Sequence, residues 1–307
     1  MSKPRRKPRR EIHGVLLLDK PRGMSSHQAL LAVRVLFNAE KAGHTGTLDP
    51  LATGLLPICF GQATKLTGHL LDARKRYLAE VKLGETTRTG DSEGEVMART
   101  DPAGIPRDAL ELAAKACTGT IRQVPPMYSA IRRDGARLYE LAREGVEVER
   151  EPREVHIEAL SVVAFDGQTA TLDVTCSKGT YIRTLAEDWA RQFGQAAHLT
   201  GLRRLAVGPF DTTRGDAMVE LSALQARSDL ASLDAQLLPT RTAVADWPHV
   251  VVSAEQAAKM DLGFAIPFEA PLGWLTMSHC EGGFLGLGEQ LADGRLQPRR
   301  WFGPRGV

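Results

Sequence analysis

The sequence is poor in the features that mark membrane-spanning, disulfide-bonded and metal-binding proteins. No apolar run in its 307 residues approaches the ~20 residues that a transmembrane helix needs. Its four cysteines form no CxxC pair, and its eight histidines show no HExxH or comparable spacing. A Walker loop and a GxGxxG turn are missing as well. We therefore expect a cytoplasmic protein with reduced cysteines, no metal and no cofactor.

Positive charge is concentrated at the ends of the chain. The formal net charge is only +2, yet residues 1–10, MSKPRRKPRR, carry six basic side chains. No apolar stretch follows them, so they are not typical of a secretory signal. Arg299, Arg300 and Arg305 add positive charge near the other end. Basic ends suit a phosphate-rich partner, and residues 1–10 are equally compatible with a disordered, solubilising leader.

The order of helical and strand patterns predicts a mixed α+β fold with a largely antiparallel sheet. Ser25 and Gln28 form a capping box, which predicts a helix through about Phe37. Pro106 is expected to open a short helix that runs to Gly119. Other apolar patterns predict strands at residues 14–20, 77–84, 155–165 and 169–177, and a helix with Ile182, Leu185, Ala186, Trp189 and Phe193 on one face that stops at Gly194.

Changes in composition suggest how the chain is divided. After the leader at residues 1–10, we expect a large domain at residues 11–247 and a small β domain at residues 248–307. The boundary is placed near Pro248 because the chain then becomes rich in glycine and short apolar runs.

One charged segment interrupts the large domain. Residues 124–152, called the insertion below, contain the turn signal Asp134-Gly135 beside Arg132, Arg133 and Arg137. We expect the insertion to be basic and mobile.

The most informative string is GHTGTLDPLATG, residues 43–54, which sets Asp49 between glycines. Pro50 pushes the preceding Asp49 away from helical backbone, and Gly46 and Gly54 permit dihedral angles that other residues resist. The string therefore predicts an ordered loop that presents one carboxylate.

The same string closely resembles the catalytic loop of the bacterial TruB family, the tRNA pseudouridine synthases that act on the T loop. The resemblance covers nearly the whole chain, from GVLLLDKPRGMSS to FLGLGEQLADGRLQPRRW, and the latter resembles the final strands of a PUA domain, an RNA-binding module. It implies a pseudouridine synthase catalytic domain, with helices flanking a mixed and largely antiparallel sheet, plus a PUA-like domain. It also implies isomerisation of uridine 55 in tRNA after the base flips out, with Asp49 as the catalytic residue.

Pseudouridine formation breaks the bond from uracil N1 to ribose C1′ and rejoins the base through C5. Asp49 could attack covalently at C1′ or at uracil C6, or it could abstract a ribose proton and give a glycal. Both routes need an ionised carboxylate, which an ordinary aspartate pKa of ~3.9 favours. The sequence leaves both routes open.

Two further catalytic candidates follow from the resemblance. The segment SKGTYIRTLAEDWA, residues 177–190, is similar to the family segment that supplies an arginine partner for the aspartate, here Arg183, and a pocket tyrosine, here Tyr181. On a helix both side chains would lie about 100° from Ile182, off the apolar stripe and free to face a cleft. Tyr77, in RKRYLAEV, matches the family tyrosine that lies against the target base, where stacking would offset part of the cost of flipping.

The remaining candidates are assigned to substrate binding by resemblance alone. His44 matches a histidine that occupies the space left by the flipped nucleotide, and Leu202 matches a leucine of the pocket wall. Lys20 and Lys65 match lysines near the substrate, where phosphate contact or loop support is expected.

RNA recognition is expected to follow backbone charge and splayed loop bases. The insertion could close over a T stem-loop, and residues 248–307 could meet the acceptor stem. We expect a monomer that needs no guide RNA. Two alternatives remain: a tRNA-binding or tRNA-folding protein that acts independently of catalysis, and a nucleotide-using enzyme. The loop at residues 43–54 lacks the lysine and Ser/Thr of a P-loop, which argues against the second alternative.

Overall fold

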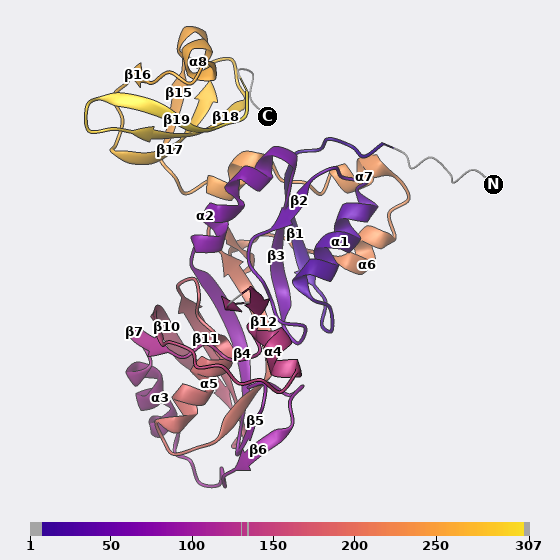
Figure 1. Cartoon of the computed structure of the whole chain (residues 1–307), viewed down its shortest axis with the longest axis vertical. Coiled ribbons are helices and arrows are strands. Elements are labelled where there is room, and N and C mark those ends of the chain that lie inside the picture. The colour runs from indigo at the N-terminus through magenta and orange to yellow at the C-terminus, as the bar shows by residue number, and fades with distance from the viewer. Residues whose placement is uncertain (1–7, 130, 134, 304–307) are drawn as a thin grey trace, which may run out of the picture.

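The computed structural model describes residues 8–129, 131–133 and 135–303, and it contains one large sheet and one smaller C-terminal sheet (Figure 1). The large sheet runs in the order β14 (Val219–Glu220), β1 (Gly14–Lys20), β3 (Thr53–Phe60), β12 (Ala197–Val207), β4 (Lys75–Leu83), β11 (Thr169–Cys176), β10 (Arg153–Phe165) and β7 (Gly119–Gln123). Two short strands pair beside this path, β2 (Ala42–His44) with β3 and β13 (Phe210–Asp211) with β12. Two further hairpins are formed by β5 (Glu85–Thr87) with β6 (Val96–Arg99), and by β8 (Arg132–Arg133) with β9 (Ala136–Arg137).

Most neighbouring strands of the large sheet are antiparallel, and the parallel pairs are β1 with β14 and β3 with β12. The predicted mixed, largely antiparallel α+β fold is therefore confirmed. The helices of this part are α1 (Ser26–Leu36), α2 (Thr67–Asp72), α3 (Arg107–Ala116), α4 (Leu138–Arg143), α5 (Ile182–Arg191), α6 (Leu221–Gln225) and α7 (Leu230–Asp234), with 3-10 turns η1 (Gly61–Leu66), η2 (Thr212–Arg214) and η3 (Thr240–Val244).

Local patterns predicted several elements correctly. The strand β1 has the bounds expected from its continuous apolar run, and α1 begins with both hydrogen bonds of the Ser25–Gln28 capping box. In β4, alternate residues from Tyr77 to Leu83 are buried as expected. The helix after Pro106 is shorter than predicted, because it ends at Ala116 and β7 begins at Gly119.

Both faces of the large sheet are covered by apolar packing. On one face, residues of α1, α3 and α5 join the sheet in the main core, which includes Val33, Leu110 and Trp189. On the other face, Val15 and Leu17 of β1 join a second cluster with η1, α2 and η3. The sheet is therefore a fixed platform for the loops that leave the ends of β2, β4 and β12.

The C-terminal sheet runs in the order β15 (His249–Val252), β17 (Gly273–His279), β18 (Phe284–Gln290), β19 (Arg295–Trp301) and β16 (Ile266–Pro267), with α8 (Ala254–Asp261) beside it. It begins one residue after the boundary predicted at Pro248 and has an apolar core of its own. Phe284, Leu287 and Phe302 nevertheless belong to the second cluster of the large sheet, so the two parts share buried contacts.

The insertion differs from the expectation in charge, and its described residues include regular structure. It contains the hairpin β8–β9 and helix α4, which gives it regular structure within its described residues. Its sequence holds six carboxylates against five arginines, so the basic character belongs to its first half alone. The prediction rested on the arginines around the turn and overlooked the glutamates that follow Arg143.

The start of the chain is also partly ordered. Residues 1–7 of the predicted leader lie outside the described residues. Within the predicted leader, Pro8 O accepts a hydrogen bond from Asn38, and Arg10 forms an ion pair with Asp234. No helix among the described residues is long and apolar enough to cross a membrane.

Candidate active site

The loop between β2 and β3 carries Asp49 and is held in place by its neighbours. The Ser26 hydroxyl accepts a hydrogen bond from Leu48 N at 2.7 Å and lies 3.2 Å from Leu48 O. The Asp49 carbonyl accepts from Ala52 N at 3.0 Å, which tightens the turn after Pro50. The carboxylate is thus presented by backbone that is fixed on both sides.

Gly54 ends this loop where a side chain could not fit. Its φ is +95°, and a Cβ atom would lie 2.4 Å from the carbonyl oxygen of Arg204 on β12. Only glycine allows β3 to approach β12 this closely at the position where the loop returns to the sheet.

The Asp49 carboxylate forms an ion pair with Arg183 of α5. Arg183 Nε lies 2.9 Å from Asp49 Oδ2, and the exposed fractions of the two side chains are 5% and 38% respectively. The remaining guanidinium nitrogens donate to the backbone carbonyls of Thr89 and Tyr128, each at 2.7 Å. Each nitrogen of the buried Arg183 guanidinium therefore has a partner, while Asp49 keeps an open side toward solvent. The structure therefore brings together Asp49 and Arg183, two of the candidates from the sequence.

Asp91 is a third member of this group that the sequence did not reveal. Its Oδ2 lies 3.9 Å from Arg183 Nε, and its Oδ1 accepts from the Thr89 hydroxyl at 2.5 Å and from Glu93 N at 3.1 Å. No motif marks this residue, because its importance arises only when the loop between β5 and β6 meets α5. Arg183 thus lies between two carboxylates.

Burial is the main influence on the ionisation of Asp49. It raises the pKa of Asp49 above the ordinary 3.8, and the like charge of Asp91 adds to this effect. The guanidinium of Arg183 and the ammonium of Lys20 act in the opposite direction. The carboxylate is consequently more basic than a surface aspartate, which favours attack or proton abstraction.

The raised pKa of Asp49 predicts how activity depends on pH. Both routes expected from the resemblance need the ionised carboxylate, so the single-turnover rate constant should fall as the pH drops through a pKa above 3.8. RNA binding measured at each pH would separate this loss from weaker binding. A rate constant that stays level down to about pH 4, the range of an ordinary aspartate, would contradict the assignment.

Replacing Asp91 with asparagine tests the second carboxylate. The amide oxygen can still accept from Thr89 and Glu93, so the substitution removes mainly the charge. Without that charge the pKa of Asp49 should fall, which moves the acid limb of the rate profile to lower pH. Arg183 would then pair with Asp49 alone and make it a weaker base, with an expected rate loss of about tenfold, or about 1.4 kcal/mol.

Asp173→Asn is the matched control, because Asp173 also pairs with an arginine, but with Arg76 and not with Arg183. The same shift of the acid limb in both variants would show that Asp91 has no specific effect.

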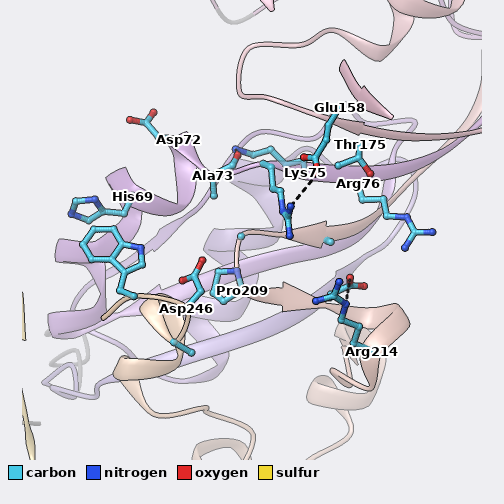
Figure 2. A pocket seen from close by; sticks show the side chains of 16 residues that line it. His69, Asp72, Ala73, Lys75, Arg76, Glu158, Thr175, Pro209, Arg214 and Asp246 are labelled. Carbon is cyan, nitrogen blue, oxygen red and sulfur yellow. Dashed lines mark hydrogen bonds and ion pairs between the residues drawn. The ribbon is translucent and has the colours of Figure 1, made fainter. Parts of the chain in front are cut away.

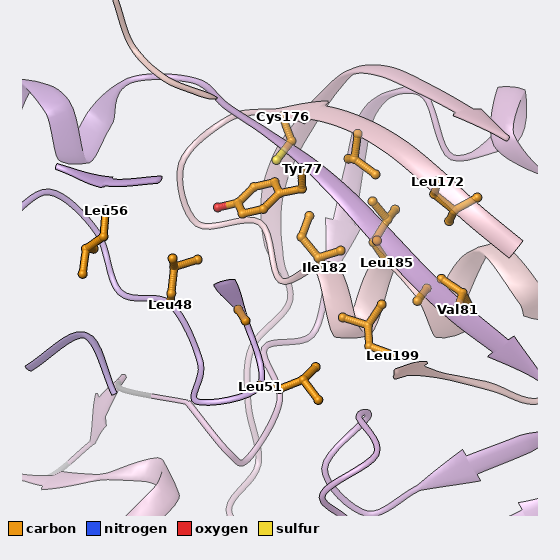
Figure 3. Packing of buried hydrophobic residues seen from close by; sticks show 14 of the residues in the cluster. Leu48, Leu51, Leu56, Tyr77, Val81, Leu172, Cys176, Ile182, Leu185 and Leu199 are labelled. Carbon is orange, nitrogen blue, oxygen red and sulfur yellow. The ribbon is translucent and has the colours of Figure 1, made fainter. Parts of the chain in front are cut away.

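Two tyrosines lie close to the carboxylate. Burial raises the pKa of both Tyr77 and Tyr181, and the Asp49 charge adds to the rise in each. Figure 3 shows the Tyr77 ring above Ile182, with its hydroxyl directed toward the side of Leu48 and Leu56. The structure thus brings both phenols to the Asp49 loop as neutral groups.

The position of Tyr181 corrects one expectation. Tyr181 does not lie on a helical turn but is the N-cap of α5, with extended backbone at φ −95° and ψ 109°. Arg183 is likewise buried and not a free side chain beside an apolar stripe. The helix begins one residue later than the helical angles assumed, so periodicity does not explain why these two residues lie near Asp49.

His44 and Leu202 flank the same loop. His44 ends β2, and its Nδ1 accepts a hydrogen bond from Gly46 N at 3.4 Å. Burial lowers the pKa of His44, and the neighbouring Arg204 lowers it further, so the imidazole is neutral at pH 7. Leu202 pairs with Ala79 in the sheet and packs against the main core, with its carbonyl 3.5 Å from the Thr53 hydroxyl.

The two lysines occupy different places. Lys20 is fully buried, and its Nζ donates to the carbonyls of Pro21 at 2.9 Å and Met24 at 2.5 Å. Burial lowers the pKa of Lys20 to about 8, and the nearby Asp49 opposes the shift. Lys65 instead lies at the joint with the C-terminal sheet, where Nζ donates to Trp301 O at 2.7 Å and sits 5.0 Å from the centre of the Phe302 ring.

Arg204 is a second residue that the sequence did not reveal. It is 1% exposed and makes no ion pair among the described residues. Its Nε donates to Leu55 O at 2.8 Å and its Nη2 to Gly46 O at 3.3 Å. Arg204 therefore connects the two ends of the Asp49 loop, and its charge faces backbone carbonyls and the Tyr77 side chain.

A cavity of about 870 Å³ lies between α2, the start of β4 and residues 245–247, and Figure 2 shows its lining. None of the candidate residues lines it. Its three arginines are already paired, Arg74 with Glu158, Arg76 with Asp173 and Arg214 with Asp211. This cavity therefore offers no unpaired arginine to an anionic ligand.

No group of three or more His, Cys, Asp or Glu side chains among the described residues could hold a metal ion. Cys59, Cys117 and Cys176 are buried as free thiols, and Cys280 is exposed. The groups that meet at the loop are the carboxylate of Asp49, the guanidinium of Arg183 and the phenols of Tyr77 and Tyr181.

Family models match almost the whole length of the chain. Residues 34–182 match the N-terminal domain of the TruB family pseudouridylate synthases. Residues 183–245 match the C-terminal domain of tRNA pseudouridylate synthase B, and residues 248–302 match the C-terminal model of pseudouridine synthase II TruB.

Two curated relatives align over nearly their full length. The tRNA pseudouridine synthase B of Pseudomonas aeruginosa is 49% identical over 95% of this chain and 96% of its own. The protein of the same name from Nitrosococcus oceani is 46% identical over 98% of each chain.

Solved structures share the fold at lower identity. A chain of a Cbf5–Nop10–Gar1 complex is 26% identical with a TM-score of 0.69, and the match covers 91% of this chain and 78% of that one. A chain of an H/ACA ribonucleoprotein bound to a substrate RNA is 23% identical with a TM-score of 0.70, covering 95% and 86%.

Proposed function

The chain belongs to the TruB family of pseudouridylate synthases, and on that premise we propose that it converts uridine 55 in the T loop of tRNA to pseudouridine, with Asp49 as the reacting carboxylate. The observation that carries the proposal is the Asp49–Arg183 pair. It combines a partly exposed carboxylate of raised pKa with a buried cation that fixes its orientation at 2.9 Å.

The residues around Asp49 suit the required sequence of bond changes. The N1–C1′ bond breaks, the uracil turns, C5 bonds to C1′, the C5 proton is lost to solvent and N1 takes up a proton. In the covalent route Asp49 Oδ bonds to C1′ or uracil C6 and this bond breaks again as the product forms. In the glycal route Asp49 takes a ribose proton and returns it. Arg183 holds the carboxylate in either route, and the reaction uses no electron acceptor, metal or nucleotide.

We assign the aromatic and apolar neighbours to the target base. Tyr77 and Tyr181 lie close to Asp49 and provide flat surfaces for a base that has left its stack, where each aromatic contact is worth roughly 1–3 kcal/mol. Leu202 forms part of the same wall. His44, which is neutral and half-buried beside Gly46, is placed to fill the gap that the flipped nucleotide leaves.

The lysines receive different roles. Lys20 supports the backbone of residues 21–24, because its Nζ donates to two carbonyls of this segment. Its ammonium group also adds positive charge near Asp49. Lys65 fixes the C-terminal sheet against η1 and carries one charge at that joint. We propose that this sheet meets the acceptor stem, as expected of a PUA-like domain, and that the insertion covers the T stem-loop.

We further propose that the enzyme works as a cytoplasmic monomer without a guide RNA. The support is the match over nearly the full length of bacterial relatives named tRNA pseudouridine synthase B. The solved structure of similar fold at 26% identity is a complex of Cbf5 with Nop10 and Gar1, so the fold itself is compatible with partners.

Mapping the product on a whole tRNA transcript tests the proposed position. After incubation with the enzyme, carbodiimide treatment and primer extension should give one stop, at the nucleotide next to position 55. A transcript with cytidine at position 55 is the control and should give none. A stop at another uridine would overturn the assignment of the substrate and leave the enzyme class intact.

A further inference from the structure

Gln123 is a buried polar residue that the reaction does not use directly. It is the last residue of β7, pairs with Arg153 of β10 in the sheet and is 2% exposed. Its side-chain amide is both a hydrogen-bond donor and an acceptor to the backbone of Tyr181. Gln123 Nε2 donates to Tyr181 O at 3.2 Å, and Gln123 Oε1 accepts from Tyr181 N at 3.1 Å.

This double contact lies at a helix start that has no side-chain cap. Tyr181 is the N-cap of α5, and its own side chain makes no capping hydrogen bond. A primary amide offers one donor side and one acceptor side, so it can pair with a backbone residue as a neighbouring strand would. Gln123 therefore fixes the backbone immediately before the first turn of α5.

Arg183 lies in that first turn, and the same short segment holds it at a second point. Tyr128 O, five residues after Gln123, accepts from Arg183 Nη2 at 2.7 Å. Pro125 and Pro126 lie between the two contacts and restrict the backbone that joins them. The segment from Gln123 to Tyr128 thus contacts both the start of α5 and the guanidinium of Arg183 that pairs with Asp49.

We propose that Gln123 is a positioning residue, whose side-chain amide sets the start of α5 and thereby the geometry at which Arg183 meets Asp49. The proposal rests on the proposed function. A misplacement of the order of 1 Å at a reacting group can cost about 100-fold in rate. We therefore expect the hydrogen bonds of Gln123 to Tyr181, two residues before Arg183, to have a large effect on the rate.

The same geometry predicts an effect on the pH profile. The groups that act on the Asp49 charge come from several elements: Arg183 of α5, Asp91 of the β5–β6 loop and Lys20 of β1, and the phenols of Tyr77 and Tyr181 lie close to it. Arg183 is the strongest of those that favour the ionised form. If Arg183 moves away, the pKa of Asp49 rises and the acid limb shifts to higher pH.

Gln123→Met tests the proposal, because methionine has a similar size and makes neither hydrogen bond. We expect the single-turnover rate constant for tritium release to fall by roughly 10- to 100-fold. The dissociation constant for the T stem-loop should change less than about threefold, since phosphate contacts dominate RNA affinity. The acid limb should move to higher pH. Gln123→Asn, which keeps the amide but withdraws it by one methylene, takes its place if the methionine variant does not fold.

Gln290→Met is the matched control. Gln290 is also a buried glutamine of a β-strand, and its Nε2 donates to a backbone carbonyl, that of Phe268, at 2.7 Å. It lies in the C-terminal sheet, so its loss should lower thermal stability without moving the rate constant or the acid limb.

The outcomes separate this proposal from the proposed function. An active wild type with an unchanged rate and acid limb in Gln123→Met overturns the role of Gln123 alone. A rate loss that matches the loss of RNA binding, or that Gln290→Met reproduces, also overturns it. A wild type that binds the stem-loop and releases no tritium overturns the proposed function instead.

Discussion

Asp49→Asn is expected to abolish tritium release from a T stem-loop labelled at uracil C5, with a rate loss of at least about 1,000-fold. The amide is uncharged, so it can neither attack carbon nor accept the ribose proton in either route. Its shape is unchanged, and Arg183 keeps its contacts with the carbonyls of Thr89 and Tyr128. RNA binding should therefore stay within a few-fold of wild type.

Asp173→Asn serves again as the control, because that carboxylate also pairs with an arginine but lies away from the loop. Tritium release by the Asp49→Asn variant at a rate near that of wild type would remove Asp49 from the chemistry. Retention of tRNA folding activity in an Asp49→Asn variant that is catalytically dead would show that the binding and folding role considered above is separable from isomerisation.

Arg183→Lys is expected to reduce the rate by roughly 100-fold, which is the cost of misplacing a reacting group by the order of 1 Å. Lysine keeps the charge, but a single ammonium group cannot meet Asp49, Thr89 and Tyr128 from one position, as the planar guanidinium does. The acid limb of the rate profile should move to higher pH as well, because Arg183 favours the ionised form of Asp49.

Single-turnover tritium release with binding measured in parallel would test this second prediction. Arg203→Lys is a suitable control: Arg203 makes a two-point ion pair with Asp19, at 3.1 and 2.7 Å, on the same strand as Leu202. Equal losses in the two variants would show that any arginine of this part of the protein affects the rate, and that Arg183 has no special role.

The Asp49 loop could be predicted from sequence because its signals are local. Proline after Asp49 and glycines at positions 46 and 54 act on the backbone of their own segment, and the string as a whole resembles a known catalytic loop. Strand β1 and helix α1 were predictable for the same reason, from a continuous apolar run and a capping box.

The network that supports the loop could not be predicted in this way. Asp91, Gln123 and Arg204 carry no motif, and each acts on a segment far away in the sequence. From sequence alone, a glutamine or arginine is expected at the surface. Only the fold shows that a backbone carbonyl or amide lies beside it and allows its burial. Such residues are invisible to periodicity, which describes one element at a time.

One sequence expectation was wrong because it considered a single element. Helical periodicity put Tyr181 on α5, whereas its backbone is extended and the helix begins at Ile182. The side-chain amide of Gln123 on β7 bonds to that backbone. The placement of Lys65 near the substrate stays a prediction, and its contact with a carbonyl of β19 is one that the sequence alone does not show.

Single-turnover tritium release by the wild-type protein tests isomerisation by Asp49 itself. An unmodified T stem-loop carries tritium at C5 of uridine 55, and RNA binding is measured on the same samples. We expect release of one tritium per bound stem-loop, with an acid limb above the pKa of an ordinary aspartate. A well-folded protein that binds the stem-loop and releases none would contradict this expectation.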